Sequence, residues 1–182
     1  MKTILIISAL LLLGTSCEAQ KTSLGMNYSI DEILERAVDP EDAIMELDSI
    51  LNEKCNYGED ISVLTEGEKV VLFIENLEQE VNNGGFDQFF FNSSGNYPHE
   101  TLKALEQIGS IEIKTLLSKA IAVWPNKNVP KIQMTRRERQ LQLSESAQEK
   151  WNTLDEEFFH SQEYIPQLLV NYIETHKKQF SK

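Results

Sequence analysis

The sequence has little of what most catalytic sites and extended folds are made from. Its 182 residues include two cysteines, three histidines, five prolines and eight glycines. Two cysteines cannot build the disulfide framework of a small secreted domain, and so few prolines and glycines exclude a collagen-like or linker-rich chain. Lysine and arginine are also outnumbered, 17 against 29 acids, which gives a formal net charge of −12. Because phosphate binding needs clustered cations, we expect no nucleic acid as a partner and favour a basic protein surface.

The motifs of nucleophilic, redox and metal chemistry are absent as well. His99, His160 and His176 lie in separate segments, and the sequence contains no HExxH, CxxC, Walker-type or GxSxG pattern. The acids at positions 39 to 42 lack the alternating ligand spacing of an EF-hand. We therefore expect no catalysis, no metal site and no cofactor. Two facing carboxylates in a cleft would be the remaining route to hydrolysis, and a sequence does not reveal a cleft.

The N-terminus is typical of an export signal. Lys2 precedes an apolar run over residues 4–13, and small residues follow this run up to Cys17. A helix over the run would be about 15 Å long, too short for a hydrocarbon layer of ~30 Å. Residues 1–17 are therefore predicted to be a signal peptide rather than a membrane span. Cys17 lies in a lipobox-like position, where acylation would anchor the protein to a membrane of the cell envelope.

Two alternatives to lipidation stay open. The segment from Cys17 to Ala19 also satisfies a small-x-small cleavage rule, and cleavage behind Ala19 would give a soluble periplasmic or secreted protein. An unused leader would leave the chain in the cytoplasm. In either exported form, the polar residues 18–28 are predicted to be a flexible tether, and residues 29–182 a single domain.

Apolar residues at helical spacing dominate the chain from Ser29 onward. The pattern predicts one helix with an apolar stripe from Ile30 to Val38, a second helix capped by Asp39, and a central, most buried helix behind Thr65. Three pairs have the spacing of capping boxes: Ser29–Glu32, Thr65–Glu68 and Thr135–Glu138. The one strand-like stretch, residues 61–64, is too short for a sheet. The predicted fold class is all-α, a single-domain bundle of about eight helices.

One segment, NGGFDQFFFNSSG at residues 83–95, combines a break in the backbone with a dense set of aromatic residues. The adjacent Gly84 and Gly85 are expected to adopt positive φ and to end one helix, after which Phe86 and Phe89 begin a short, buried one. The structural interpretation is a turn within the core. The functional alternative is a pocket for a small polar molecule, lined by the amides of Asn83, Gln88 and Asn92.

Two later groups of residues accompany this segment: Ala104, Leu105, Ile108 and Gly109, and then Leu154, Asp155 and Phe158. With them, the chain resembles the DNA mimic protein 19 family over roughly residues 64–172. The resemblance implies an all-helical domain and, as in the family's namesake, an acidic dimer whose carboxylates imitate DNA phosphates and occupy the DNA-binding face of a transcription factor. The residues of the shared motif are core and turn residues and do not include the acidic surface. We therefore expect a different partner for an exported chain and a DNA-mimic role for one that keeps its leader, with homodimerisation left open.

Most of the negative charge lies near the start of the predicted domain. Residues 31–60 contain eleven acids and two bases, and several acids stand four residues apart, where like charges on a helix repel each other. Helix stability does not explain this arrangement. A row of carboxylates at this spacing resembles neighbouring phosphates, so we predict a partner-binding acidic face composed of Asp31, Glu35, Asp39, Asp42 and Glu46. An ordinary solvated surface is the alternative.

Residues 114–139 have the opposite charge, with seven bases and one acid. We expect these cations to pair with the acidic N-terminal half, within the domain or across a dimer, or else to face lipid phosphates once Cys17 is acylated. The function predicted from the sequence is a non-enzymatic, acidic helical interaction module, exported and lipid-anchored. A domain that binds a small polar ligand around NGGFDQFFFN is the alternative.

Overall fold

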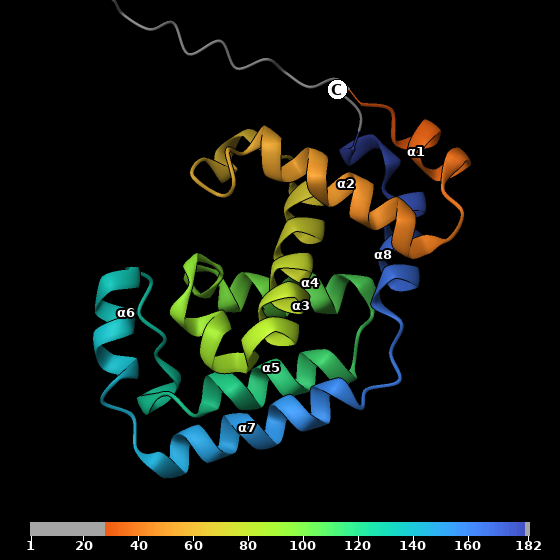
Figure 1. Cartoon of the computed structure of the whole chain (residues 1–182). Coiled ribbons are helices and arrows are strands. Elements are labelled where there is room, and N and C mark those ends of the chain that lie inside the picture. The colour runs from red at the N-terminus through yellow and green to blue at the C-terminus, as the bar shows by residue number, and fades with distance from the viewer. Residues whose placement is uncertain (1–27, 181–182) are drawn as a thin grey trace, which may run out of the picture.

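The computed structural model describes residues 28–180, and every regular element in that range is a helix (Figure 1). The α-helices are α1 (Ile30–Arg36), α2 (Pro40–Lys54), α3 (Glu66–Phe91), α4 (Pro98–Ile108), α5 (Glu112–Ala122), α6 (Gln133–Gln140), α7 (Glu145–Phe159) and α8 (Ile165–Thr175). Short 3-10 helices cover Ile61–Val63, Ser93–Asn96, Pro125–Lys127 and Lys177–Gln179. The prediction of a single all-α bundle of about eight helices is confirmed.

Helix α3 is the central helix of the fold, as its apolar sequence predicts. The Thr65 side chain accepts the backbone N–H of Glu68, and the Glu68 carboxylate accepts the N–H of Thr65 at 2.8 Å, so the predicted capping box starts the helix. Its apolar residues from Val70 to Val81 are buried on most sides. In Figure 1, α3 runs from α2 toward the end of the molecule where α5 and α7 lie side by side, and it contacts α2, α4, α6 and α7.

Aromatic side chains fill the core where α3, α5 and α7 meet. The ring of Phe90 stacks on Trp151, with centroids 5.1 Å apart, and packs edge-on to Trp124 at 5.6 Å. The indole N–H of Trp151 donates to the backbone oxygen of Ala120 at 3.0 Å, which satisfies a polar group that would otherwise be buried unpaired. These rings fix how the second half of α3 sits against α7.

The two N-terminal helices begin where the capping residues predict. The side chains of Ser29 and Asp39 accept backbone N–H groups in the first turns of α1 and α2. Helix α2 packs against α3 and α8. The prediction that the apolar stripe of the first helix extends to Val38 is wrong: α1 ends at Arg36, and Val38 is 90% exposed in the turn before Pro40.

One further local prediction differs from the structure. The Thr135–Glu138 pair does not cap a helix, because α6 begins earlier, at Gln133, behind an Ile132 that makes no side-chain cap bond. The stretch at residues 61–64, which is too short for a sheet, contains a 3-10 helix over Ile61–Val63. The signal peptide, Cys17 and residues 18–27 of the predicted tether lie outside the described residues. Tyr28, the last residue of that tether, contacts the domain through a 2.6 Å hydrogen bond to Glu68. Among the described helices, none combines the length and the hydrophobicity that crossing a bilayer requires.

Candidate functional site

The two glycines of the NGGF segment break α3 as expected. Gly85 has a φ of +72°, whereas Gly84 is extended at −164°, so positive φ is confirmed at Gly85 and wrong at Gly84. The backbone N–H of Phe86, the first residue after the break, donates to the Asp155 carboxylate of α7 at 2.8 Å. Asp155 therefore caps the second part of α3 from a helix far along the chain.

The amide side chains after this break bind one carboxylate. Glu80, which precedes the break, accepts hydrogen bonds from Gln88 and Asn92, each at 2.8 Å, and from the Ser94 hydroxyl at 3.1 Å. Asn83 lies apart from them and lines a different hollow, described below. The structure thus does not bring the three amides around one cavity. Gln88 and Asn92 hold the turn together instead.

The aromatic residues of the segment belong to the core. Phe86, Phe89 and Phe90 are fully buried, and only Phe91 reaches solvent, where the Arg137 guanidinium lies 4.2 Å from its ring centre. Arg136, from the basic part of the sequence, is fully buried as well and donates to backbone carbonyl groups at the end of α3, among them those of Phe90 and Asn92. Most residues of NGGFDQFFFN are therefore buried in the core or hydrogen-bonded to other residues of the domain.

The five acids of the predicted face lie on α1, on α2 and in the turn between them, at one end of the molecule (Figure 1). Asp31 forms an ion pair with Lys177, and Glu46 forms one with Arg36. Asp39 and Asp42 accept backbone N–H groups at 2.9 and 3.1 Å, which stabilises the first turn of α2. Glu35 is exposed. These carboxylates therefore reach solvent, and four of them also have a local structural role.

Three of the basic residues between positions 114 and 139 form ion pairs inside the domain, though not with the acidic N-terminal half. Lys114 binds Glu106, Lys119 binds Glu157, and Lys131 binds Glu100, each at 2.9 Å. These acids lie on α4 and α7. Pairing of these three lysines with the N-terminal half inside the domain is therefore wrong. For Lys114 and Lys119 the reason is that α5 contacts α4 and α7, which places its cations beside the acids of those helices.

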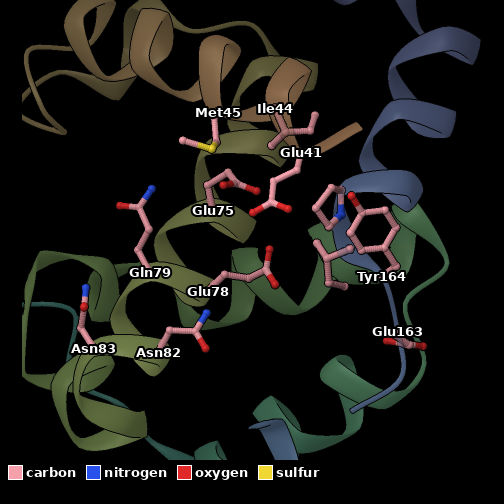
Figure 2. A pocket seen from close by; sticks show the side chains of 12 residues that line it. Glu41, Ile44, Met45, Glu75, Glu78, Gln79, Asn82, Asn83, Glu163 and Tyr164 are labelled. Carbon is pink, nitrogen blue, oxygen red and sulfur yellow. The ribbon is translucent and has the colours of Figure 1, made fainter. Parts of the chain in front are cut away.

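A cleft of about 480 Å³ lies between α2, α3 and the start of α8. Its lining comprises Glu41, Ile44 and Met45 from α2, Glu75, Glu78, Gln79, Asn82 and Asn83 from α3, and Glu163, Tyr164, Ile165 and Pro166. Figure 2 shows the carboxylates of Glu41, Glu75 and Glu78 directed into the same space. Among the described residues, no lysine, arginine or histidine lines this cleft.

Glu75 is the most unusual of these carboxyl groups. Its side chain is 9% exposed, and its Oε1 atom is buried with no hydrogen-bond partner among the described residues. Burial, and then the negative charges of Glu78, Asp48 and Glu41, raise the pKa of Glu75 to about 8. Burial and the charge of Glu41 raise the pKa of Glu78 to about 7. At neutral pH the cleft therefore holds protons on carboxyl groups that would be ionised in water.

Two acids beside the cleft have partners of their own. Asp48 accepts hydrogen bonds from Gln79 at 2.9 Å and Asn52 at 3.0 Å. Glu163 accepts the Ser110 hydroxyl at 2.6 Å and three backbone N–H groups at the start of α5. Burial disfavours the charge of Glu163, but these hydrogen bonds outweigh burial and lower its pKa. The carboxyl groups that lack such partners are therefore on α2 and α3.

The arrangement does not resemble a metal centre. In residues 28–180, no three histidine, cysteine, aspartate or glutamate side chains lie where they could hold one metal ion. The acids at positions 39 to 42, which could have been calcium ligands by residue type, instead cap and begin α2.

Neither Glu75 nor Glu78 was assigned to a site from the sequence. One local signal pointed to them: they are charged residues three positions apart on the helix predicted to be the most buried. Glu41 gave no such signal, because it lies among many acids of α2 and approaches α3 only in the folded chain.

The raised pKa of Glu75 predicts a pH dependence of stability. The folded protein keeps this proton to about pH 8, whereas an unfolded chain loses it near 4.5, so the stabilisation is complete below 4.5 and is lost as the pH rises through 8. We expect Glu75→Gln to gain about 4 to 5 kcal/mol in free energy of unfolding at pH 8.5 and almost nothing at pH 4.5, because the pKa rises from 4.5 to about 8 and each pKa unit equals about 1.4 kcal/mol. Urea denaturation at the two pH values measures this difference. As a control, Glu149→Gln removes an exposed charge from α7. If the two variants change the free energy of unfolding equally at both pH values, the raised pKa of Glu75 is contradicted.

A protein-family model described as DMP19-like protein matches residues 62–176, which is more than half of the chain. The matched segment contains the NGGF break, Asp155, Arg136 and the α3 and α8 sides of the cleft, and it begins after α1 and α2. Neither a search of curated proteins nor a search of solved structures found a match.

Proposed function

This chain belongs to the DMP19-like protein family, and from that starting point we propose that it is a non-enzymatic, acidic binding module for a basic protein surface. The family match covers the helical scaffold. The chemistry of the proposed contact comes from α1 and α2, which precede the matched segment. One observation supports the proposal above all others. Of the eleven acids between residues 31 and 60, only Asp48 is buried.

Few cations neutralise this surface. Within the described residues, the ion pairs of α1 and α2 are Arg36–Glu46, Lys54–Glu68 and Lys177–Asp31. Glu68 belongs to α3, so two of these pairs involve acids of α1 and α2, namely Asp31 and Glu46. A surface of this kind raises the association rate of a positively charged partner and orients it. Its attraction is screened within about 8 Å at physiological salt, so affinity should fall as salt is added.

The partner test uses amide substitutions that keep side-chain shape. We expect Asp31→Asn, Glu35→Gln and Asp42→Asn together to weaken binding of an isolated basic partner about tenfold, since exposed ion pairs contribute about 0.2 to 1 kcal/mol each. Titration calorimetry at 50 and 300 mM salt measures the change. The matched control is Glu145→Gln, Glu149→Gln and Glu156→Gln, which removes three exposed acids from α7. Affinity indifferent to both salt and the α1–α2 triple variant would contradict the proposal.

We further propose that the protein is exported and lipid-anchored through Cys17 at a membrane of the cell envelope. The leader sequence supports this proposal, and ten residues separate Cys17 from Tyr28, the first described residue. Mass spectrometry of the mature N-terminus decides between the forms. An acylated Cys17 fits the anchor, a free Gln20 indicates a soluble exported form, and an intact Met1 would contradict export and direct attention to a DNA-mimic role in the cytoplasm.

A further inference from the structure

We propose that the cleft between α2, α3 and α8 binds an organic cation, a primary ammonium or guanidinium group on an aliphatic stem, with Glu75 as its main carboxylate. This site is separate from the acidic face of α1 and α2, because none of the five acids of that face lines the cleft. The same chemistry is available from a free amine and from a lysine or arginine side chain of a protein.

The first support is the orphaned oxygen of Glu75. A buried polar atom without a hydrogen bond costs about 1 to 3 kcal/mol, and more when it is charged. The described residues include four others of this kind, but Glu75 is the one of the five that lines the cleft. The other buried acid of this region, Asp48, has two amide partners. Glu75 has none for Oε1, although Figure 2 shows its carboxylate directed into the cleft. A ligand that donates N–H groups would supply the missing hydrogen bond.

The second support is the sign of the charge around Glu75. The titratable groups facing it are Glu41 and Asp48 on α2, Glu78 on α3, and Glu163 and Tyr164 before α8. None of these groups is a cation, so an anionic ligand would meet repulsion from every side of the cleft. A positive group would be attracted by Glu41, Glu75 and Glu78 together.

The third support concerns the kind of cation. Metal ions require oxygen ligands at about 2.0 to 2.6 Å in close array, and the described acids do not form such a group. Ammonium and guanidinium groups accept longer contacts of about 2.7 to 2.9 Å, and several donors can reach separate carboxylates. The apolar wall supplied by Ile44, Met45 and Tyr164 suits an aliphatic stem, and the Tyr164 ring can also face a cation.

The size of the cleft agrees with a ligand of this class. At about 480 Å³ it lies in the range of small-molecule pockets, and it has room for an amino-acid side chain or a short diamine. Asn82 and Asn83, at the rim on α3, offer amide oxygens to further N–H groups.

The protons held in the cleft make binding pH-dependent. Because the raised pKa values leave Glu75 and Glu78 partly protonated near pH 7, an entering cation must displace protons. Binding should therefore tighten as the pH rises from 6 to 8 and should release protons.

The experiment titrates the purified full chain with four probes in a calorimeter at pH 6 and pH 8. Agmatine and cadaverine represent free amines, and the amides of N-acetyl-arginine and N-acetyl-lysine represent protein side chains. We expect at least one probe to bind, with at least tenfold higher affinity at pH 8. Tighter binding of the free amines identifies a small-molecule site, and tighter binding of the capped residues identifies a side-chain site.

Two variants separate the cleft from general charge effects. Glu75→Gln should weaken probe binding at least tenfold while the protein stays folded, as its thermal melting curve will show. Glu149→Gln removes the same charge from an exposed position on α7 and should bind normally. The proposal is overturned if no probe binds, if Glu75→Gln binds as tightly as the unmodified protein, or if calcium chloride competes as well as the amines. None of these results depends on the basic protein partner proposed for α1 and α2.

Discussion

Replacing Arg136 by alanine is expected to lower the free energy of unfolding by about 3 to 5 kcal/mol. The Arg136 side chain is completely buried, and its guanidinium donates to the backbone oxygens of Phe90, Asn92, Pro130 and Lys131. Alanine would leave these carbonyl groups without their donor and would open a cavity beside them. The cation also lies at the C-terminal end of α3, where the helix dipole favours positive charge.

The shape of the guanidinium matters as much as its charge. Burial, and then the charge of Arg137, lower the pKa of Arg136 to about 10, so the group remains a cation at neutral pH. Lysine would keep the charge but could not reach four carbonyl groups in one plane. We expect Arg136→Lys to recover less than half of the loss. Arg139→Ala, on the exposed side of α6, should change stability by less than about 0.5 kcal/mol.

Equilibrium denaturation in urea measures all three Arg variants. A loss below about 1 kcal/mol for Arg136→Ala, or full rescue by lysine, would show that the carbonyl cluster does not depend on this side chain. Urea denaturation of a Gly95→Ala variant tests the same cluster, because a Cβ at Gly95 would lie 2.7 Å from the Arg136 Nε atom.

Gly85→Ala is expected to cost about 3 to 4 kcal/mol. At φ +72° and ψ −174°, Gly85 adopts a conformation that costs an alanine about 1 to 3 kcal/mol. A Cβ at this position would also lie 2.2 Å from Oδ2 of Asp155. Asp155 would have to move away, and the N–H of Phe86 would lose the carboxylate that caps it, which adds about 1 kcal/mol.

Variants of two other glycines, Gly109 and Gly84, separate the causes. Gly109→Ala, at φ +80° with open space around it, should show the backbone strain alone, about 1 kcal/mol. Gly84→Ala would place its Cβ 2.9 Å from the Cβ atom of Gln88, which the helix holds in place, and 2.4 Å from Oε1 of Gln88, so it should cost more than Gly109→Ala although its φ is not positive. Thermal or urea denaturation ranks the three glycine variants by their loss in free energy of unfolding. If Gly85→Ala costs no more than Gly109→Ala, the contact with Asp155 does not constrain the break.

The break at Gly85 also separates two roles along α3. Before it, Glu75, Glu78 and Asn82 line the cleft, whereas Gln88 and Asn92 follow it and turn to Glu80. The family match begins at residue 62, so the α3 and α8 sides of the cleft lie within the matched segment and Glu41 lies outside it. One wall of the cleft is therefore supplied by α2, which precedes the family segment.

Local sequence was sufficient for the features that depend on residues a few positions apart. Helical spacing predicted the bundle, Ser29, Asp39 and Thr65 predicted three helix starts, and paired glycines predicted the break in α3. Each of these features arises from hydrogen bonds or apolar contacts within about one helical turn, which a sequence displays directly.

The tertiary structure alone decided which charged residues are buried and what they contact. Arg136 bonds to Phe90 across 46 positions, and Asp155 bonds to Phe86 across 69. Glu75 approaches Glu41 only because α2 crosses α3. No spacing rule reveals such contacts, since the burial and pKa of an ionisable group depend on neighbours that the folded chain brings together. The sequence by itself determined an acidic helical scaffold, and only its folding created a cleft with an unpaired carboxyl group.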